Sequence, residues 1–335
     1  MHGVKRYNHS RELLEQKRQQ DKQRIVNYRA LTAQTLDARD AQIYTAQSLE
    51  LTTSLLSTNP EFNTVWNYRR DILEALHPGA RPSSEAFPED ELEFTMAQLK
   101  RFPKVYWIWN HRVWVLMYFC RDNAAVWRRE LAIVDKLLSM DARNYHGWHY
   151  RRQVVAQIER IEQRSLDRSE LEYVTQVINR NISNYSAWHQ RVQLVTRLFQ
   201  FKELPAEEMH TLLRGEVDYI TNALYTDADD QSVWFYIKWF ITNDVVKTTL
   251  PSDEYAKMLR GLRDNVVLIN EDDVEFSGSD NNWCLKMLIV IEGALKDAGV
   301  ESNAEYSKVA AEYLNKLITA DPDRMNRYKH LLGSE

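Results

Sequence analysis

Apolar positions along this chain form short helical stripes. The segment 130–140, Glu-Leu-Ala-Ile-Val-Asp-Lys-Leu-Leu-Ser-Met, places its leucines and valine three or four residues apart, on one face of a helix. Val174, Val177 and Ile178 repeat this spacing further along the chain. The pattern therefore predicts amphipathic helices that bury one face.

Tryptophans mark an internal repeat. Five similar motifs are centred on Trp66, Trp109, Trp148, Trp188 and Trp234, at spacings of 43, 39, 40 and 46 residues. Four of the five carry an arginine three residues later: Arg69, Arg112, Arg151 and Arg191. Trp283 indicates an eroded sixth copy. A repeat of about 40 residues accommodates two helices of about 14 to 16 residues with short connections.

The repeat predicts an all-α fold, a right-handed α-α superhelix (solenoid) of antiparallel helix pairs with a crescent outline. With only 9 glycines and 8 prolines in 335 residues, the chain has few helix breakers. We expect residues 1–47 to form a basic segment and a capping helix, residues 48–300 the repeats, and residues 301–335 a C-terminal capping helix. These parts are expected to make a single structural domain.

Residues typical of turns precede the repeated tryptophans. Asp141 and Asn181 suit a helix N-cap or a turn, and Pro60 and Pro103 suit the first turn of a helix, where proline is tolerated. A further group of polar residues and glycine at 272–282 indicates a loop.

Charge and composition exclude several classes of protein. The formal net charge of −5 argues against a generally basic nucleic-acid binder, although residues 1–30 are locally basic. Mean hydropathy is −0.54, so direct membrane insertion is not expected. Two cysteines cannot build a disulfide framework, which favours a cytoplasmic protein. The glycine-rich motifs of nucleotide-binding folds do not occur in the sequence.

Most residues of the repeat are expected to be structural. A repeated tryptophan buries a large area between helix pairs, and the arginine three residues later lies on the same face. Its guanidinium is expected to bond carbonyl oxygens or a carboxylate of the neighbouring repeat.

Three other residues indicate chemistry. Lys104, Tyr145 and His146 lie near the starts of the tryptophan helices in adjacent repeats. Equivalent positions of a solenoid line one edge, where helix N-termini also present free N–H groups. An ammonium, a phenol and an imidazole at this edge would suit a phosphate or diphosphate. Since no self-contained active site and no zinc site is evident, the chain reads as a scaffold that completes a site on a partner.

The tryptophan repeats, with Pro-Lys-x-Tyr-x-x-Trp-Asn-His-Arg at 103–112 and Asp-Ala-Arg-Asn-Tyr-His-x-Trp at 141–148, resemble the protein prenyltransferase α subunits over residues 59–324. The start Met-His-Gly, the block Asn-Pro-Glu-Phe-Asn at 59–63 and the stretch 181–188 resemble most the fungal branch that forms Rab geranylgeranyltransferase, type II.

The resemblance implies one subunit of an enzyme. Family α subunits wrap a β subunit, which carries a zinc ion and most of the lipid pocket. The enzyme transfers a geranylgeranyl group from geranylgeranyl diphosphate to C-terminal cysteines of Rab GTPases, which an escort protein presents. Lys104, Tyr145 and His146 match the family residues that stabilise the leaving diphosphate.

Two residues are specific to the branch. Farnesyl and type I enzymes are similar to each other in carrying a glutamine, which helps to bind the substrate's terminal carboxylate, where this chain has Trp107. That difference fits an enzyme that relies on the escort protein, although Trp107 could also simply pack on the β subunit. His2 could reach the partner's zinc as a removable ligand, or belong to a solvated tail.

Two alternatives remain open from the sequence. One is the α subunit shared by farnesyltransferase and type I geranylgeranyltransferase. The other is a non-catalytic helical-repeat scaffold that only binds proteins.

Overall fold

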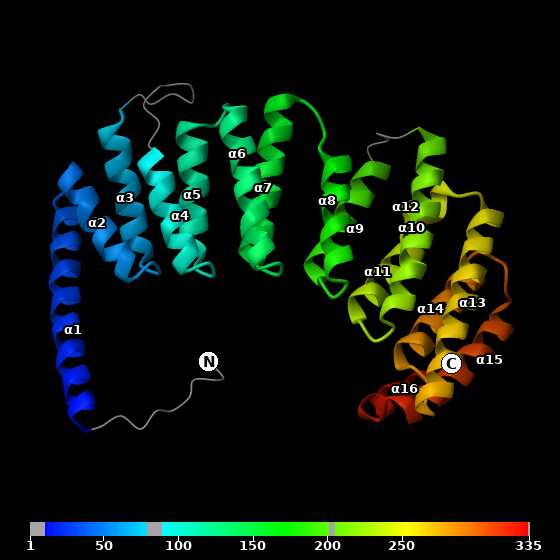
Figure 1. Cartoon of the computed structure of the whole chain (residues 1–335). Helices are drawn as coiled ribbons and strands as arrows, with labels where there is room; N and C mark the ends of the chain where they lie inside the picture. Colours follow the sequence, from blue (N-terminus) through cyan, green and yellow to red (C-terminus); the bar gives the residue numbers. More distant parts are fainter. Residues whose placement is uncertain (1–10, 79–88, 201–204, 334–335) are drawn as a thin grey trace. The chain divides into compact units, whose positions relative to one another are not determined.

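A computed structural model describes residues 11–78, 89–200 and 205–333, and every regular element in these ranges is helical (Figure 1). The helices are α1 (Arg11–Asp40), α2 (Ala46–Thr58), α3 (Asn63–Leu76), α4 (Glu89–Arg101), α5 (Tyr106–Phe119), α6 (Ala124–Met140), α7 (Tyr145–Glu162), α8 (Asp167–Arg180), α9 (Tyr185–Gln200), α10 (Ala206–Thr226), α11 (Gln231–Thr242), α12 (Asp244–Thr249), α13 (Ser252–Ser277), α14 (Asn282–Asp297), α15 (Asn303–Ala320), the 3-10 turn η1 (Pro322–Arg324) and α16 (Met325–Gly333). None of the described helices is long and apolar enough to cross a membrane.

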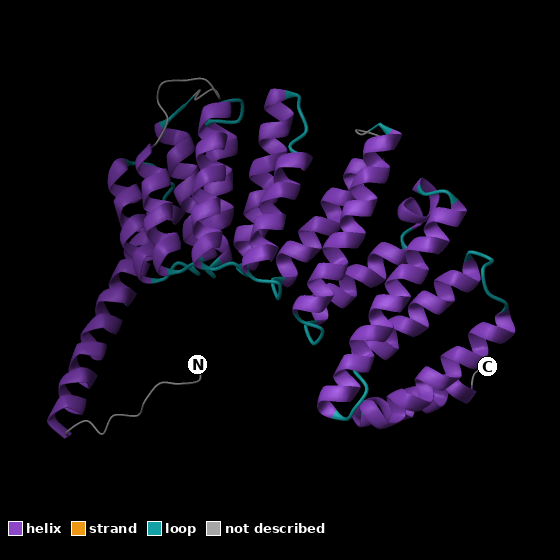
Figure 2. Cartoon of the chain, turned by 45° about the vertical axis from the view of Figure 1, so that its right-hand side comes forward, coloured by secondary structure: helices purple, strands orange, loops and turns teal. Residues whose placement is uncertain are grey.

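The chain divides into two compact units, residues 1–164 and residues 165–335. In unit 1, α2 packs on α3, α4 on α5 and α6 on α7, and the second helices α3, α5 and α7 contact one another in order. In unit 2, α8 packs on α9, α10 on α11 and α13 on α14, followed by α15 and α16. Figure 2 shows the described helices and the loops that join them. This arrangement confirms the predicted all-α fold of repeated helix pairs. The boundaries expected at 47/48 and 300/301, and the single domain, stay predictions.

Each repeated tryptophan anchors the turn that precedes its helix. The indole Nε1 donates to the carbonyl oxygen six residues earlier in all five copies, at 2.7 to 3.0 Å. The acceptors are the carbonyls of Pro60, Pro103, Ala142, Ile182 and Ala228. All five tryptophans are at most 4% exposed. One side chain therefore fills the space between helix pairs and satisfies a turn carbonyl that would otherwise lack a partner.

The prolines lie in these turns and not inside the helices. Pro60 precedes α3, which begins at Asn63, and Pro103 precedes α5, which begins at Tyr106. The prediction of proline in the first helical turn was therefore wrong. The turn tolerates proline because the carbonyl, and not the missing N–H, makes the bond to tryptophan.

Asp141 and Asn181 were predicted to be helix N-caps or turn residues, and in the structure both lie in turns. Asp141 ends α6 and Asn181 ends α8. The N-cap of α7 is Asn144, three residues further on, whose amide N–H donates to the Asp141 carbonyl at 3.1 Å. In the turns before α7 and α11, one asparagine or aspartate thus ends the first helix and a second one, three residues later, caps the next helix.

The loop predicted at 272–282 is mostly helical. α13 continues to Ser277 and ends at Gly278, whose φ of 75° lies in the left-handed region that favours glycine. Asn281 then caps α14. In α7 and α11 the repeated tryptophan lies four residues after its N-cap. The corresponding residue in α14 is Leu285, which is buried, so Trp283 lies two positions before the repeat position and is not its sixth tryptophan.

The arginines of the repeat link successive helix pairs. Arg112 on α5 donates from Nε and Nη2 to the Glu130 carboxylate on α6, at 2.8 and 2.7 Å. Its Nη1 bonds Thr95 and the Leu92 carbonyl on α4, the first helix of its own pair. Tyr150 on α7 donates to the same Glu130 at 2.5 Å. Both charges are buried, and the guanidinium makes four hydrogen bonds to protein groups.

The same bridge occurs in other repeats. The equivalent two-pronged pairs are Arg69 with Glu91 and Arg191 with Glu216. Arg151 pairs with Asp135 on the first helix of its own pair. Each arginine therefore bonds neighbouring helices through carboxylates, and in the first two pairs also through carbonyl oxygens.

Breaking one bridge should be costly. Arg112→Met leaves Glu130 buried and without its cation, and we expect the free energy of unfolding to fall by about 3 to 5 kcal/mol in urea denaturation. The double variant Arg112→Met/Glu130→Gln should recover part of this loss, because no charge is then left unpaired. Arg128→Met removes the exposed pair with Glu162 and serves as the control, with an expected loss under about 1 kcal/mol. Equal losses for Arg112→Met and Arg128→Met would contradict the role of the bridge.

Candidate functional site

Lys104 lies in the turn before α5, and this turn contacts the turn before α7. The ammonium of Lys104 is 2.5 Å from the Asp141 carboxylate, and both side chains are exposed, Lys104 to 67% and Asp141 to 38%. Asn144 Nδ2 donates to the Pro103 carbonyl at 3.1 Å and joins the two turns a second time. Lys104 is therefore placed beside the start of the next tryptophan helix.

Tyr145 and His146 are the first two residues of α7. Tyr145 is exposed and His146 is half-buried. The His146 ring lies 5.7 Å from the Tyr145 ring and 6.1 Å from the Tyr106 ring of α5, measured between centroids. Trp107 stands edge-on to Tyr106 at 5.1 Å. The structure thus brings all the candidate edge residues named above to the adjoining starts of α5 and α7.

Two backbone amides at the start of α7 are already occupied. The Asn144 side chain accepts hydrogen bonds from the amides of His146 and Gly147, at 3.0 and 3.2 Å. The expectation of free N–H groups was therefore wrong for these two amides, because an asparagine N-cap satisfies them. These two amides of α7 are therefore not available to an anion, whereas the start of α5 has no side-chain cap.

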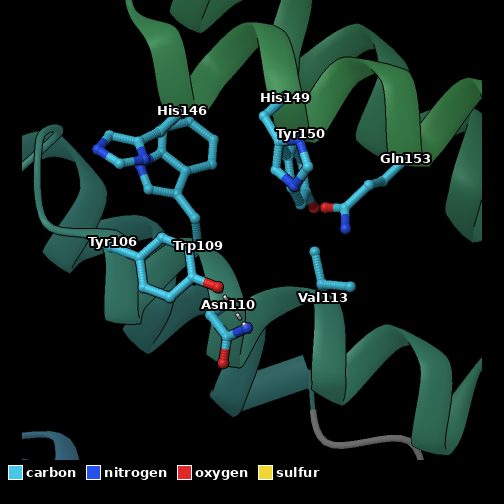
Figure 3. A pocket seen from close by; sticks show the side chains of 8 residues that line it. All are labelled: Tyr106, Trp109, Asn110, Val113, His146, His149, Tyr150 and Gln153. Carbon is cyan, nitrogen blue, oxygen red and sulfur yellow. Dashed lines mark hydrogen bonds between the residues drawn. The ribbon is translucent and has the colours of Figure 1, made fainter.

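A small pocket opens between α5 and α7 (Figure 3). Its volume is about 40 Å³. It is lined from α5 by Tyr106, Trp109, Asn110 and Val113, and from α7 by His146, His149, Tyr150 and Gln153. A space of this size holds a few water molecules at most. A diphosphate would therefore bind on the edge above the pocket and not inside it.

Positive charge reaches the pocket walls from partly buried arginines. Burial lowers the pKa of Arg70 and of Arg152. Burial, Arg152 and His146 together lower the pKa of His149, so this imidazole is neutral at pH 7. The fixed positive charges near the edge are therefore Lys104 and the arginines, and the imidazole of His149 contributes a dipole.

Tyr106 was not identified from the sequence as a site residue. It occupies the position three residues before Trp109, as Tyr145 does before Trp148. Comparing the repeats position by position would have found it. Asn110, which also lines the pocket, carries no such signal, because its role depends on the contact between α5 and α7.

A polar chain connects the pocket wall to the core. Nε2 of the buried His111 lies 2.8 Å from Glu91 Oε1, and Arg70 Nε donates to His111 Nδ1 at 3.4 Å. Arg70 Nη2 donates to Asn110 Oδ1 at 2.6 Å, and Asn110 Nδ2 donates to the Tyr106 hydroxyl at 3.4 Å. Since Nδ1 accepts from Arg70, His111 carries its proton on Nε2 and donates it to Glu91. The orientation of Tyr106 thus depends on buried groups.

The neutral state of His111 should make stability depend on pH. Burial lowers the pKa of His111 to about 4, against 6.5 in the unfolded chain. Between these values the unfolded state binds more protons, so stability falls as pH drops. We expect this group to lower the free energy of unfolding by about 2 kcal/mol between pH 7 and pH 5, and His111→Gln to remove that part of the slope.

Glu91 titrates in a lower pH range than His111. Burial would raise the pKa of Glu91, but hydrogen bonds from His111 and the charge of Arg69 lower it to about 2. The stability that the ionised Glu91 contributes to the folded protein is therefore lost only below about pH 4.5. Urea denaturation of the wild type and of His111→Gln at pH 7 and pH 5 tests the role of His111. If the free energy of unfolding falls equally in both proteins between these pH values, His111 is not the group responsible.

Within the described ranges, no three His, Cys, Asp or Glu side chains gather in a way that could hold a metal ion. His2, considered above as a ligand of a partner's zinc, lies outside the described residues. Cys120 and Cys284 are free and buried, and burial raises the pKa of both thiols to about 12. Neither cysteine is therefore a reactive thiolate at neutral pH.

The helix pairs coincide with a known repeat. The family described as "Protein prenyltransferase alpha subunit repeat" matches residues 45–76, 88–119, 127–158, 167–198 and 213–244. Each matched segment spans all or most of one helix pair, from α2 with α3 to α10 with α11. The helix-pair fold and the five matched segments therefore define the class of protein prenyltransferase α-subunit repeat proteins.

Proteins of similar sequence indicate a particular branch of this class. The Saccharomyces cerevisiae geranylgeranyl transferase type-2 subunit alpha is 54% identical over 332 residues, which cover 99% of each chain. The Candida albicans protein of the same name is 43% identical over 162 residues, 47% of this chain and 44% of that protein. The rat protein of that name is 38% identical over 47% of this chain and 27% of its own length.

A solved structure supports the fold alone. A chain of the structure described as "Candida albicans protein geranylgeranyltransferase-I complexed with GGPP" matches with a TM-score of 0.66 and 20% identity, over 92% of this chain and 90% of that chain. Together with the repeats, the full-length identity decides the branch. The chain belongs to the protein prenyltransferase α-subunit family, in its fungal type II branch.

Proposed function

We propose that this chain is the α subunit of a heterodimeric geranylgeranyltransferase type II. In this proposal the enzyme transfers a geranylgeranyl group from geranylgeranyl diphosphate to C-terminal cysteines of Rab GTPases in the cytoplasm. The observation that carries the proposal is the 54% identity to the yeast type-2 α subunit over 99% of both chains. The match to a chain of the type I geranylgeranyltransferase structure, at 20% identity, shows the fold alone and does not favour the alternative α subunit of farnesyl and type I enzymes.

A β subunit is the required partner in this proposal. The described part of this chain offers an edge of donors and cations but no enclosed cavity for a lipid beside it. The zinc ion of the enzyme, held by the β subunit, would supply the substrate cysteine as a thiolate. This chain would contribute the residues that face the departing diphosphate.

Lys104 carries the main role at this edge. Transfer breaks a carbon–oxygen bond of the diphosphate ester and forms a carbon–sulfur bond, so negative charge grows on the leaving diphosphate. The exposed pair of Lys104 with Asp141 contributes at most about 1 kcal/mol. A diphosphate with more charge than one carboxylate can therefore draw the ammonium away from Asp141. His146 and Tyr145 lie beside it as further hydrogen-bond donors.

Trp107 bears on how the Rab substrate is recognised. It lies on the first turn of α5 beside Tyr106, in the place where the related farnesyl and type I enzymes are expected to carry glutamine. An indole has one donor and cannot replace an amide that binds a carboxylate. We propose that the Rab is instead presented by an escort protein.

The test is reconstitution with a type II β subunit. We expect a stable heterodimer that transfers labelled geranylgeranyl to a Rab only when the escort protein is present. Lys104→Ala should lower the single-turnover rate by about a hundredfold or more, because one donor to the developing charge is lost, while heterodimer formation stays unchanged. Lys100→Ala, at an exposed lysine of α4, is the control and should keep the wild-type rate.

Three results would count against the proposal. Modification of short C-terminal peptides without escort protein would favour the farnesyl or type I branch. Failure to form any heterodimer would favour a helical-repeat scaffold. A wild-type rate for Lys104→Ala would remove the diphosphate role of the edge while leaving the subunit assignment intact.

A further inference from the structure

Unit 2 contains a large groove among α11, α14, α15 and α16. Its volume is about 840 Å³. The residues that matter for its chemistry are Phe235, Lys238, Trp283, Lys286, Arg327 and Leu331. We call it the C-terminal groove. Nothing in the proposed function uses it.

The C-terminal groove is the repeat equivalent of the pocket beside the candidate site. Positions can be counted from Trp109 and Trp148 in the pocket, and from Trp234 and Leu285 in the groove. The first helix of each contributes positions −3, 0, +1 and +4, and the second helix contributes −2, +1, +2 and +5. Both openings therefore lie on the same face of their second helices, within their own units.

The same positions carry different chemistry in the two places. At −2 and +1 of the second helix, the pocket has His146 and His149, whereas the groove has Trp283 and Lys286. The groove is about twenty times larger in volume than the pocket, from 840 Å³ against 40 Å³. The groove is therefore large enough to hold a side chain or a short segment of another molecule.

The groove is electropositive although the chain is acidic overall. Four cationic side chains line it, those of Lys238, Lys286, Arg324 and Arg327, and no carboxylate does. Lys286 and Arg324 are paired with Asp321, which is buried behind the wall. Among the described residues, Lys238 and Arg327 have no carboxylate within ion-pair distance. Two exposed cations are thus left without counter-charges.

Apolar side chains of the same groove are also exposed. Phe235 is 51% exposed and Leu331 is 43% exposed. Trp283 packs edge-on against Phe235, with 5.8 Å between ring centroids, and Lys286 lies over the Trp283 ring. Aromatic and aliphatic surface inside a concave, charged rim is typical of the central part of a protein interface.

We propose that the C-terminal groove docks an acidic segment of the β subunit, which places a large apolar side chain against Phe235 and Leu331 and carboxylates near Lys238 and Arg327. This proposal rests on the proposed function for the existence of that partner. Lys286 and Arg324 share Asp321, so the two cations left for an outside partner are Lys238 on α11 and Arg327 on α16. An acidic segment that also carries a large apolar side chain matches these two cations and the exposed Phe235 and Leu331 of the same groove.

The test measures heterodimer affinity after charge reversal. Lys238→Glu/Arg327→Glu should weaken binding of the full-length chain to the β subunit by about tenfold to a hundredfold, because two attractions become repulsions. The association rate of the wild type should fall with added salt more steeply than that of the variant. Phe235→Ala/Leu331→Ala should raise the dissociation rate without changing the salt dependence.

Lys257→Glu/Arg260→Glu is the matched control. It makes the same change of charge at exposed positions of α13, which does not line the groove. It should bind the β subunit like the wild type. Circular dichroism and thermal unfolding of every variant check that the α subunit itself stays folded.

The outcomes separate the possibilities. If the wild type forms a heterodimer and Lys238→Glu/Arg327→Glu binds equally well, the docking proposal fails and the proposed function stands. If that variant instead loses binding to phosphatidylserine vesicles while the heterodimer is unaffected, the groove is a lipid site and the docking proposal fails. If the wild type forms no heterodimer, both proposals fail.

Discussion

Buried arginine–carboxylate bridges hold the successive helix pairs of each unit together. Arg112 shows why so much depends on them: its guanidinium joins α4, α5 and α6, and Glu130 passes the connection on to Tyr150 of α7. A desolvated charge pair is stable only when nearly every donor and acceptor has a partner. The bridge therefore fixes the distance and register between pairs more strictly than apolar packing, which tolerates small shifts.

The repeated tryptophans connect the buried core to the turns that precede their helices. The Pro103 carbonyl accepts from the Trp109 indole and from Asn144 Nδ2, so one oxygen ties a core residue, the turn before α5 and the cap of α7 together. Lys104 follows Pro103 directly, and Tyr145 follows Asn144. The candidate catalytic residues thus stand next to the groups that hold the turns. The positions of the exposed Lys104 and Tyr145 are therefore set by buried neighbouring residues.

The repeat also explains how equivalent positions of different helix pairs can form surfaces of different chemistry. The bridge and the indole bond occupy fixed positions in the repeat, which leaves the residues around them free to vary. At the −2 position, Trp107, His146 and Trp283 replace one another on α5, α7 and α14. In the proposals above, this variation separates a diphosphate edge on unit 1 from a docking groove on unit 2. The shared register keeps both on the same side of their helix pairs.

The sequence by itself determined the helix pairs and their period, because tryptophan and arginine recur at a spacing that fits two helices in each repeat. The family followed from the resemblance of the motifs at 103–112 and 141–148 to known α subunits. It also indicated Lys104, Tyr145 and His146, since each lies near the start of a tryptophan helix. It misplaced Pro60 and Pro103, and it gave no sign of Asn110 or of the C-terminal groove. Only the tertiary structure decided these points. Caps, carbonyl partners and pocket walls depend on which helices meet, and residues such as Trp234 and Arg327 come together only when separate helices pack.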